Sequence, residues 1–121
     1  MSAGVVAAVL VAGVAGALAR FGLSTALARH PRFPFAVLAV NVVGSAVAGV
    51  IGGLAERAVV SADWKLILIT GFCGGLTTFS TFATETVQLV MTGRWRPAVA
   101  SVALNLVVGI GAAALGYALT R

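Results

Sequence analysis

The sequence predicts an all-α membrane protein with four transmembrane helices, and three observations carry this prediction. Hydrophobic residues make up 60% of the chain and charged residues 9%, whereas a soluble domain has about 25% charged residues. A chain of 121 residues is too short to bury so much apolar surface in a soluble core. The apolar residues fall into four runs long enough to cross a bilayer, which takes about 20 residues. The expected helices of this single domain (residues 1–121) are 3–27, 35–54, 64–91 and 97–119.

The first two expected helices contain the small residues that permit close packing. Gly, Ala and Val dominate residues 3–27, and Gly44, Ser45, Ala48 and Gly49 form a small-residue face on the second helix. No Lys or Arg precedes the first apolar run. We therefore expect a retained membrane helix rather than a cleaved signal peptide.

The polar and sulfur-containing residues argue against other classes of protein. The net charge is +5, but the basic residues stand singly at the ends of apolar runs. This placement is typical of membrane-flanking residues and not of a nucleic-acid-binding surface. Cys73 is the single cysteine, so an internal disulfide or a Cys-x-x-Cys metal site is excluded, and we expect it to fill space among small residues. His30 lies alone in a proline-containing loop, where we expect solvent exposure rather than metal binding.

The third apolar run has a centre that does not suit lipid. Residues 71–85 contain two adjacent glycines, several threonines, a serine and Glu85. A helix interrupted within a membrane frees backbone groups that hydrocarbon cannot satisfy, so they must line a polar cavity, hold an ion or find protein partners. We expect this helix to be broken in mid-membrane, with the break at Gly74, Gly75 and Thr77.

Three stretches of the chain resemble the CrcB/Fluc family of fluoride channels. They are residues 71–82 (Gly-Phe-Cys-Gly-Gly-Leu-Thr-Thr-Phe-Ser-Thr-Phe) with Glu85 following, residues 16–20 (Gly-Ala-Leu-Ala-Arg) and residues 41–45 (Asn-Val-Val-Gly-Ser). The resemblance implies a channel that exports fluoride passively across the cell membrane and relieves fluoride toxicity. It also implies an antiparallel dimer with a sodium ion at its centre, held by backbone carbonyls at the positions of Gly74 and Thr77.

Five residues are candidates for the fluoride pathway, and three of them also have a purely structural interpretation. Asn41 either joins helices by hydrogen bonds or offers amide N–H groups to an anion, and the resemblance favours the second. Phe79 and Phe82 are three residues apart, which alone indicates a packing stripe. The resemblance implies instead that their ring edges, which carry positive charge, face the anion. Ser80 and Thr81 would then add hydroxyl donors beside the same path.

Two charged residues and a polar helix face each have more than one interpretation. Arg20 either reaches the headgroups or forms a vestibule that attracts anions, which the resemblance favours. Glu85 is either paired with a base, such as Arg20 of the same or a partner chain, or acts as a gate or ion relay. Ser101, Asn105 and Gly109 are spaced by four and share one helix face. The family usually has a polar residue at each of these positions, and Asn105 and Gly109 look like departures from its pattern.

The distribution of basic residues bears on orientation and assembly. Four crossings place both termini on one side, with Arg57, Lys65 and Arg121; the other side has Arg20, Arg29, Arg32, Arg94 and Arg96. A bias of five to three is slight, and loop charge sets orientation, so insertion in both directions is permitted. An antiparallel, dual-topology homodimer follows, and a heterodimer with a sister protein of opposite orientation remains open.

Two other functions compete with the channel. A small proton-coupled multidrug exporter also has four helices in an antiparallel dimer, but it needs a carboxylate in its first helix, and residues 3–27 contain no Asp or Glu. A membrane assembly factor without transport activity would explain the glycines but not the polar centre of the third run. An enzyme is not expected, because no nucleophile–base pair, metal cluster or phosphate-binding loop is present.

Overall fold

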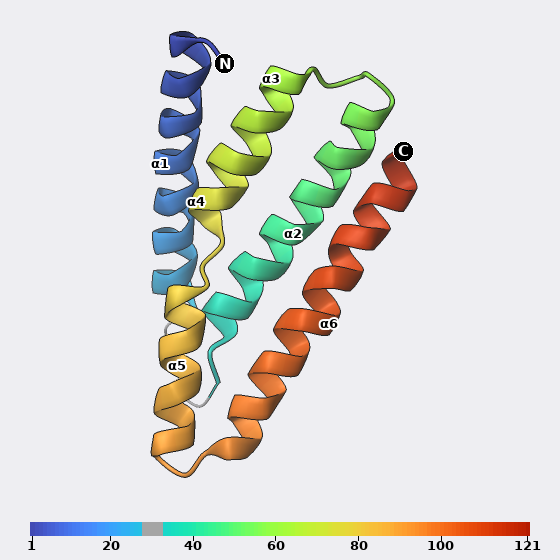
Figure 1. The fold of residues 1–121 in the computed structure, drawn as a ribbon. Coiled ribbons are helices and arrows are strands. Elements are labelled where there is room, and N and C mark those ends of the chain that lie inside the picture. Colours follow the sequence, from blue (N-terminus) through green and yellow to red (C-terminus); the bar gives the residue numbers. More distant parts are fainter. Residues whose placement is uncertain (28–32) are drawn as a thin grey trace.

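The computed structural model describes residues 1–27 and 33–121, and in this part of the chain the regular structure is helical throughout. The expectation for His30 lies outside the described residues. The elements, drawn in Figure 1, are α1 (Ala3–Ala26), α2 (Phe35–Glu56), α3 (Ala62–Lys65), the π-helix η1 (Leu66–Cys73), α4 (Gly74–Leu76), α5 (Ser80–Met91) and α6 (Trp95–Thr120).

Four helical stretches are long and apolar enough to cross a membrane: Ala3–Ala26, Phe35–Glu56, Ala62–Met91 and Trp95–Thr120. The prediction of four transmembrane helices is therefore confirmed. Every end lies within two residues of its expected position. The third stretch begins early because the hydroxyl of Ser61 accepts a hydrogen bond from the backbone N–H of Trp64, as an N-cap residue does.

The helices alternate in direction, so both termini lie at the same end of the molecule (Figure 1). They pack mainly as two pairs: α1 lies against η1 and α4, and α2 lies along α6. The lower helix α5 contacts α6 rather than continuing along the first pair. The third crossing thus changes partners halfway through the bundle.

Glycines bring the helices of each pair into backbone contact. A methyl group added at Gly16 of α1 would lie 2.8 Å from the backbone nitrogen of Leu76 in α4. In the other pair, a methyl group at Gly116 of α6 would lie 2.9 Å from the carbonyl oxygen of Ala46 in α2. Such close approach is how small residues stabilise helix pairs in lipid, where the hydrophobic effect offers no help. The expected small-residue packing is confirmed, since Gly44 and Gly49 are also buried.

The third crossing is broken as predicted, but the break lies further along the chain than expected. Gly74 has helical torsion angles (φ −62°, ψ −37°), and α4 continues through Gly75 to Leu76. The backbone becomes extended at Thr77 (φ −80°, ψ 157°), and helix resumes at Ser80. Placing the break at Gly74 and Gly75 was wrong because Gly75 serves close packing, its Cα hydrogens facing the backbone of Gly13 in α1.

Local hydrogen bonds at the end of α4 centre on Thr77. The hydroxyl of Thr77 donates to the carbonyl of Cys73 (2.9 Å), which also accepts from the N–H of Thr77 (3.0 Å). A threonine hydroxyl that donates to the carbonyl four residues earlier slightly destabilises its helix and often bends it. The preceding π-helix already has widened turns, a feature frequent at functional sites. Cys73 itself is 4% exposed, in agreement with the space-filling role expected for it.

We predict that replacing Gly16 with Ala lowers the stability of the folded protein. The added methyl group would overlap the backbone of η1 and α4, and overpacking of this kind costs about 1–3 kcal/mol. We expect the melting temperature in detergent, followed by fluorescence-detected size exclusion, to fall by about 5 °C or more.

Gly22→Ala is the matched control on the same helix. Nothing lies within 4 Å of a methyl group at that position, and Ala favours helix over Gly. Equal melting temperatures for the two variants would contradict the role of Gly16 in close packing.

Candidate functional site

A groove of about 330 Å³ lies where the interrupted third crossing meets α2 and α6. Amides, hydroxyls and aromatic rings share its wall. The lining residues are Asn41, Ser45, Thr77, Thr78, Phe79, Phe82, Asn105 and Leu106. The groove therefore brings together three features that are far apart in the sequence. They are the break in the third crossing, Asn41 of α2 and Asn105 of α6.

The side chain of Asn41 holds the backbone of Thr78. Its amide nitrogen donates to the carbonyl oxygen of Thr78 (3.1 Å), and its amide oxygen accepts from the N–H of Thr78 (2.9 Å). These are the two hydrogen bonds that a neighbouring β-strand would supply to an extended residue. One side-chain amide thus supplies hydrogen bonds to both the N–H and the carbonyl of a residue that is not in a helix, within the membrane-spanning region.

A chain of hydrogen bonds continues from Asn41 to α6. The amide nitrogen of Asn41 also donates to the side-chain oxygen of Asn105 (2.9 Å), and Asn105 donates to the backbone carbonyl of Ser101 (2.8 Å). Ser101 is fully buried and Gly109 is buried as well, so the predicted shared face of α6 is confirmed. Both amide hydrogens of Asn41 have protein acceptors, as its interhelical interpretation requires. Its contact with an anion stays a prediction.

Thr78 is a residue of the site that the sequence analysis missed. Its hydroxyl accepts from the backbone N–H of Thr81 (3.2 Å) and lies 3.4 Å from the hydroxyl of Ser80. This hydroxyl satisfies an N–H in the first turn of α5, although the N-cap residue of that helix is Phe79, so the available signal was a hydroxyl residue just before the helix. Ser80 and Thr81 form the first turn of that helix and do not line the groove.

Two carbonyl groups at the break are the expected ligands of a cation. Within residues 1–27 and 33–121, the carbonyl oxygens of Gly74 and Thr77 accept no backbone hydrogen bond from outside a helix. Sodium is a hard cation that prefers oxygen ligands. The residues expected at a sodium site therefore present the right donor type, although the site itself stays a prediction.

Phe79 and Phe82 lie together on the groove wall. Their ring centroids are 6.0 Å apart, the ring planes are tilted by 49°, and Phe79 is 79% exposed. A tilted pair of this kind leaves ring edges accessible, and the edge is the positive part of an aromatic quadrupole. The geometry is compatible with the expected role beside an anion and with aromatic packing.

The two charged candidates are not paired with each other in the chain. The Nε of Arg20 donates to the carbonyl oxygen of Gly75 (3.2 Å), just before the break. One carboxylate oxygen of Glu85 is buried and has no hydrogen-bond partner among the described residues. The expected Glu85–Arg20 pair within one chain is therefore absent from this part of the structure. The arginine instead holds a positive charge close to the carbonyls at the break.

The fold and the groove define a small multi-pass membrane protein with a polar site at an interrupted helix. A model of the CrcB-like family (CrcB-like protein, Camphor Resistance) matches residues 7–117. The chain belongs to this family.

Individual relatives agree with the family assignment over nearly the whole chain. A protein of Renibacterium salmoninarum named "Fluoride-specific ion channel FluC" is 47% identical over 116 residues, covering 89% of this chain and 92% of the relative. Proteins of the same name are 39% identical in Pyrococcus horikoshii, with 100% and 99% covered, and 42% identical in Sorangium cellulosum, with 90% and 88% covered. These relatives are named as ion channels, and the drug-exporter alternative is not favoured.

We predict that Asn41→Leu loosens the break. Leucine fills similar space but leaves both the N–H and the carbonyl of Thr78 without partners, at a cost of about 1–3 kcal/mol for each group. We expect amide hydrogen exchange of residues 77–79, measured by mass spectrometry, to accelerate by roughly tenfold or more.

Asn105→Leu is the comparison for this variant. It removes the link from Asn41 to α6 but leaves the two bonds between Asn41 and Thr78 in place. We expect it to change exchange at the break much less, and an equal acceleration in both variants would refute the special role of Asn41.

Proposed function

We infer that this protein is a fluoride-selective channel. The observation that carries the inference is the groove at the break, where hydroxyls, two amides and aromatic rings meet on a wall without charged side chains. The relatives named as fluoride-specific channels support the same function. A channel rather than an enzyme is proposed because the groove contains weak donors and no reactive pair.

Selective passage requires that protein donors replace the water around fluoride. We assign the edges of Phe79 and Phe82 and the hydroxyls of Ser80 and Thr81 to the pathway, with Asn41 beside them. Asn41 reaches an anion only by giving up its bond to Thr78 or to Asn105, so its main contribution is to hold the path open. Conduction needs binding that is favourable but weak and spread over several sites, and these neutral donors meet that need.

Positive charge along the path comes from two sources in this proposal. Arg20 attracts anions at the vestibule while it is held against Gly75. A sodium ion at the dimer centre, bound by the carbonyls of Gly74 and Thr77, would supply fixed positive charge near the midplane. The carbonyls at the break support this site, and no acidic side chain is needed for it.

The assembly proposed is an antiparallel homodimer in the cell membrane, with a heterodimer of sister chains as its variant. Two residues that line the groove, Phe79 and Leu106, are 79% and 55% exposed on the single chain. A second copy related by a two-fold axis would bring two breaks together. Hydrogen fluoride crosses membranes as a neutral acid and dissociates inside, so a passive exit for the anion would relieve fluoride toxicity.

We predict that liposomes containing the purified protein release fluoride but retain chloride. Fluoride is small and strongly hydrated, so a path lined by neutral donors that replace its water would favour it. A fluoride-selective electrode and a chloride electrode measure the two fluxes after dissipation of the membrane potential. Release of both anions at similar rates would contradict a fluoride-selective pathway.

We predict that Phe82→Ile reduces fluoride flux by roughly fivefold or more, since an aromatic edge contact is worth about 1 kcal/mol. Isoleucine fills the space but has no positive ring edge. Phe21→Ile serves as control, because Phe21 is 71% exposed on α1 and does not line the groove. Both variants should retain the elution volume of the native protein, and unchanged flux in Phe82→Ile would remove the ring-edge argument.

A further inference from the structure

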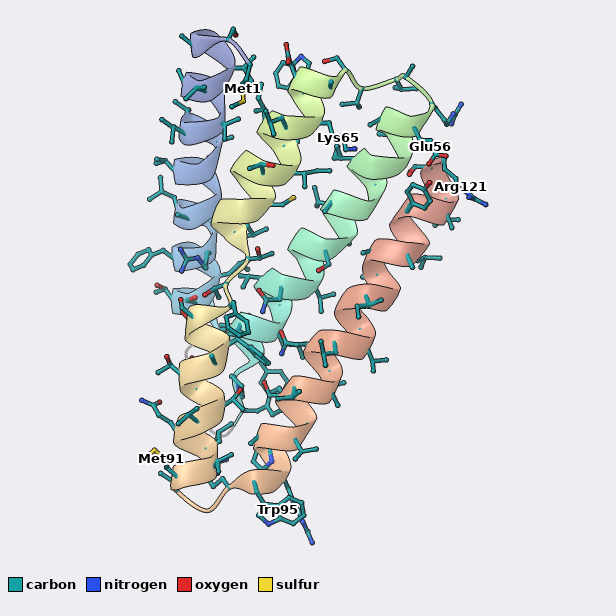
Figure 2. The ribbon with its side chains drawn as sticks, viewed as in Figure 1. Met1, Glu56, Lys65, Met91, Trp95 and Arg121 are labelled. Carbon is teal, nitrogen blue, oxygen red and sulfur yellow. The ribbon has the colours of Figure 1, made fainter. Side chains whose placement is uncertain are left out.

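A second polar hollow lies at the opposite end of α2, far along the chain from Asn41. It encloses about 500 Å³ between the end of α2, the start of the third crossing and the end of α6. The lining residues are Gly52, Ala55, Glu56, Val60, Ala62, Lys65 and Tyr117. Figure 2 shows Glu56 and Lys65 at this end of the bundle, which is also the end with both termini. The channel mechanism uses none of these residues.

The hollow holds one acid and one base that do not neutralise each other. Glu56 and Lys65 both line it, yet within the described chain neither forms an ion pair with a separation of 4.0 Å or less. Tyr117 donates its hydroxyl to the Oε2 of Glu56, which fixes the carboxylate from the α6 side. The guanidinium of Arg121 lies 5.7 Å from the centre of the Tyr117 ring and so stacks on the residue that orients Glu56.

The position of the hollow limits what can occupy it. It lies where membrane-spanning helices end, because α2 ends at Glu56 and the third crossing begins at Ala62. Trp64 beside it is 58% exposed, as expected of an aromatic residue in the interfacial layer of a membrane. The layer of lipid headgroups borders this end of the bundle and is the source of occupant that we consider, and the volume suits a small molecule.

The geometry points to a binding site for the zwitterionic headgroup of an aminophospholipid. Its primary ammonium group donates to the carboxylate of Glu56, and its phosphate accepts from the ammonium of Lys65. The apolar residues of the wall, Ala55 and Val60 among them, face the glycerol and the start of the acyl chains. Charge-assisted hydrogen bonds at both ends make this contact stronger than a neutral one.

The same charges disfavour other headgroups. Phosphatidylcholine carries a quaternary ammonium without a hydrogen to donate, so it loses the bond to Glu56. Phosphatidylglycerol has no cationic group and places its negative charge near a carboxylate. Phosphatidylethanolamine satisfies both residues, and it is the headgroup that the hollow selects.

Native mass spectrometry of the purified protein, titrated separately with the three phospholipids, tests the proposal. We expect phosphatidylethanolamine to bind about tenfold more tightly than phosphatidylcholine, and this preference to fall severalfold in both Glu56→Gln and Lys65→Met. The amide oxygen introduced by Glu56→Gln would still accept the hydroxyl of Tyr117, so the fold around the hollow is kept. Equal binding of phosphatidylethanolamine and phosphatidylcholine would overturn the site.

Two exposed charges at the same end provide matched controls. Arg57→Gln and Asp63→Asn remove one positive and one negative charge that do not line the hollow, and both are expected to keep the lipid preference. A preference lost equally in these variants would show a general surface-charge effect and refute the site. Tightest binding of phosphatidylglycerol, dependent on Lys65 alone, would also refute it, and fluoride flux is not needed to read any of these results.

Discussion

The structure depends on the pair of hydrogen bonds between the side chain of Asn41 and the backbone of Thr78. A membrane-spanning helix satisfies its own backbone, and an interruption loses that advantage at once because lipid offers neither donor nor acceptor. One amide on α2 replaces both missing partners of Thr78. The helix is therefore able to stop and restart within the span, and the groove lies at this interruption.

Contacts around Asn41 allow its side chain to form the two hydrogen bonds with Thr78. Asn41 must come within hydrogen-bond distance of a backbone, so the third crossing has to lie close to α2. Gly44, one turn after Asn41, has no side chain, and the methyl of Thr77 occupies the space where its Cβ would be. On the far side, Asn105 fixes the orientation of the Asn41 amide through its own bond to Ser101. The amide is thus oriented from α6 while it holds the third crossing.

The sequence allows prediction of the helices and of the broken crossing, because composition and run length reflect burial in lipid directly. It does not locate the break, since Gly74 and Gly75 have two possible uses, flexibility and close approach, and only the position of α1 decides between them. Asn41 and Thr78 are 37 residues apart, so no local pattern reveals that their groups meet. The pairing of Arg20 with Gly75 rather than Glu85 is likewise set by the approach of α1 to α4.

The backbone carbonyls at the break are relevant to how the protein assembles. The carbonyls of Gly74 and Thr77 lie near the middle of the third crossing, and a polar group left unsatisfied in hydrocarbon would cost several kcal/mol. An apolar partner surface would not remove that cost, whereas a cation shared with a second break would. The guanidinium of Arg20 bonds the neighbouring carbonyl of Gly75, and it would repel a divalent cation at this point more strongly than a singly charged one. The proposed sodium site and the proposed dimer are therefore linked, because both would place partners at the same break that opens the groove.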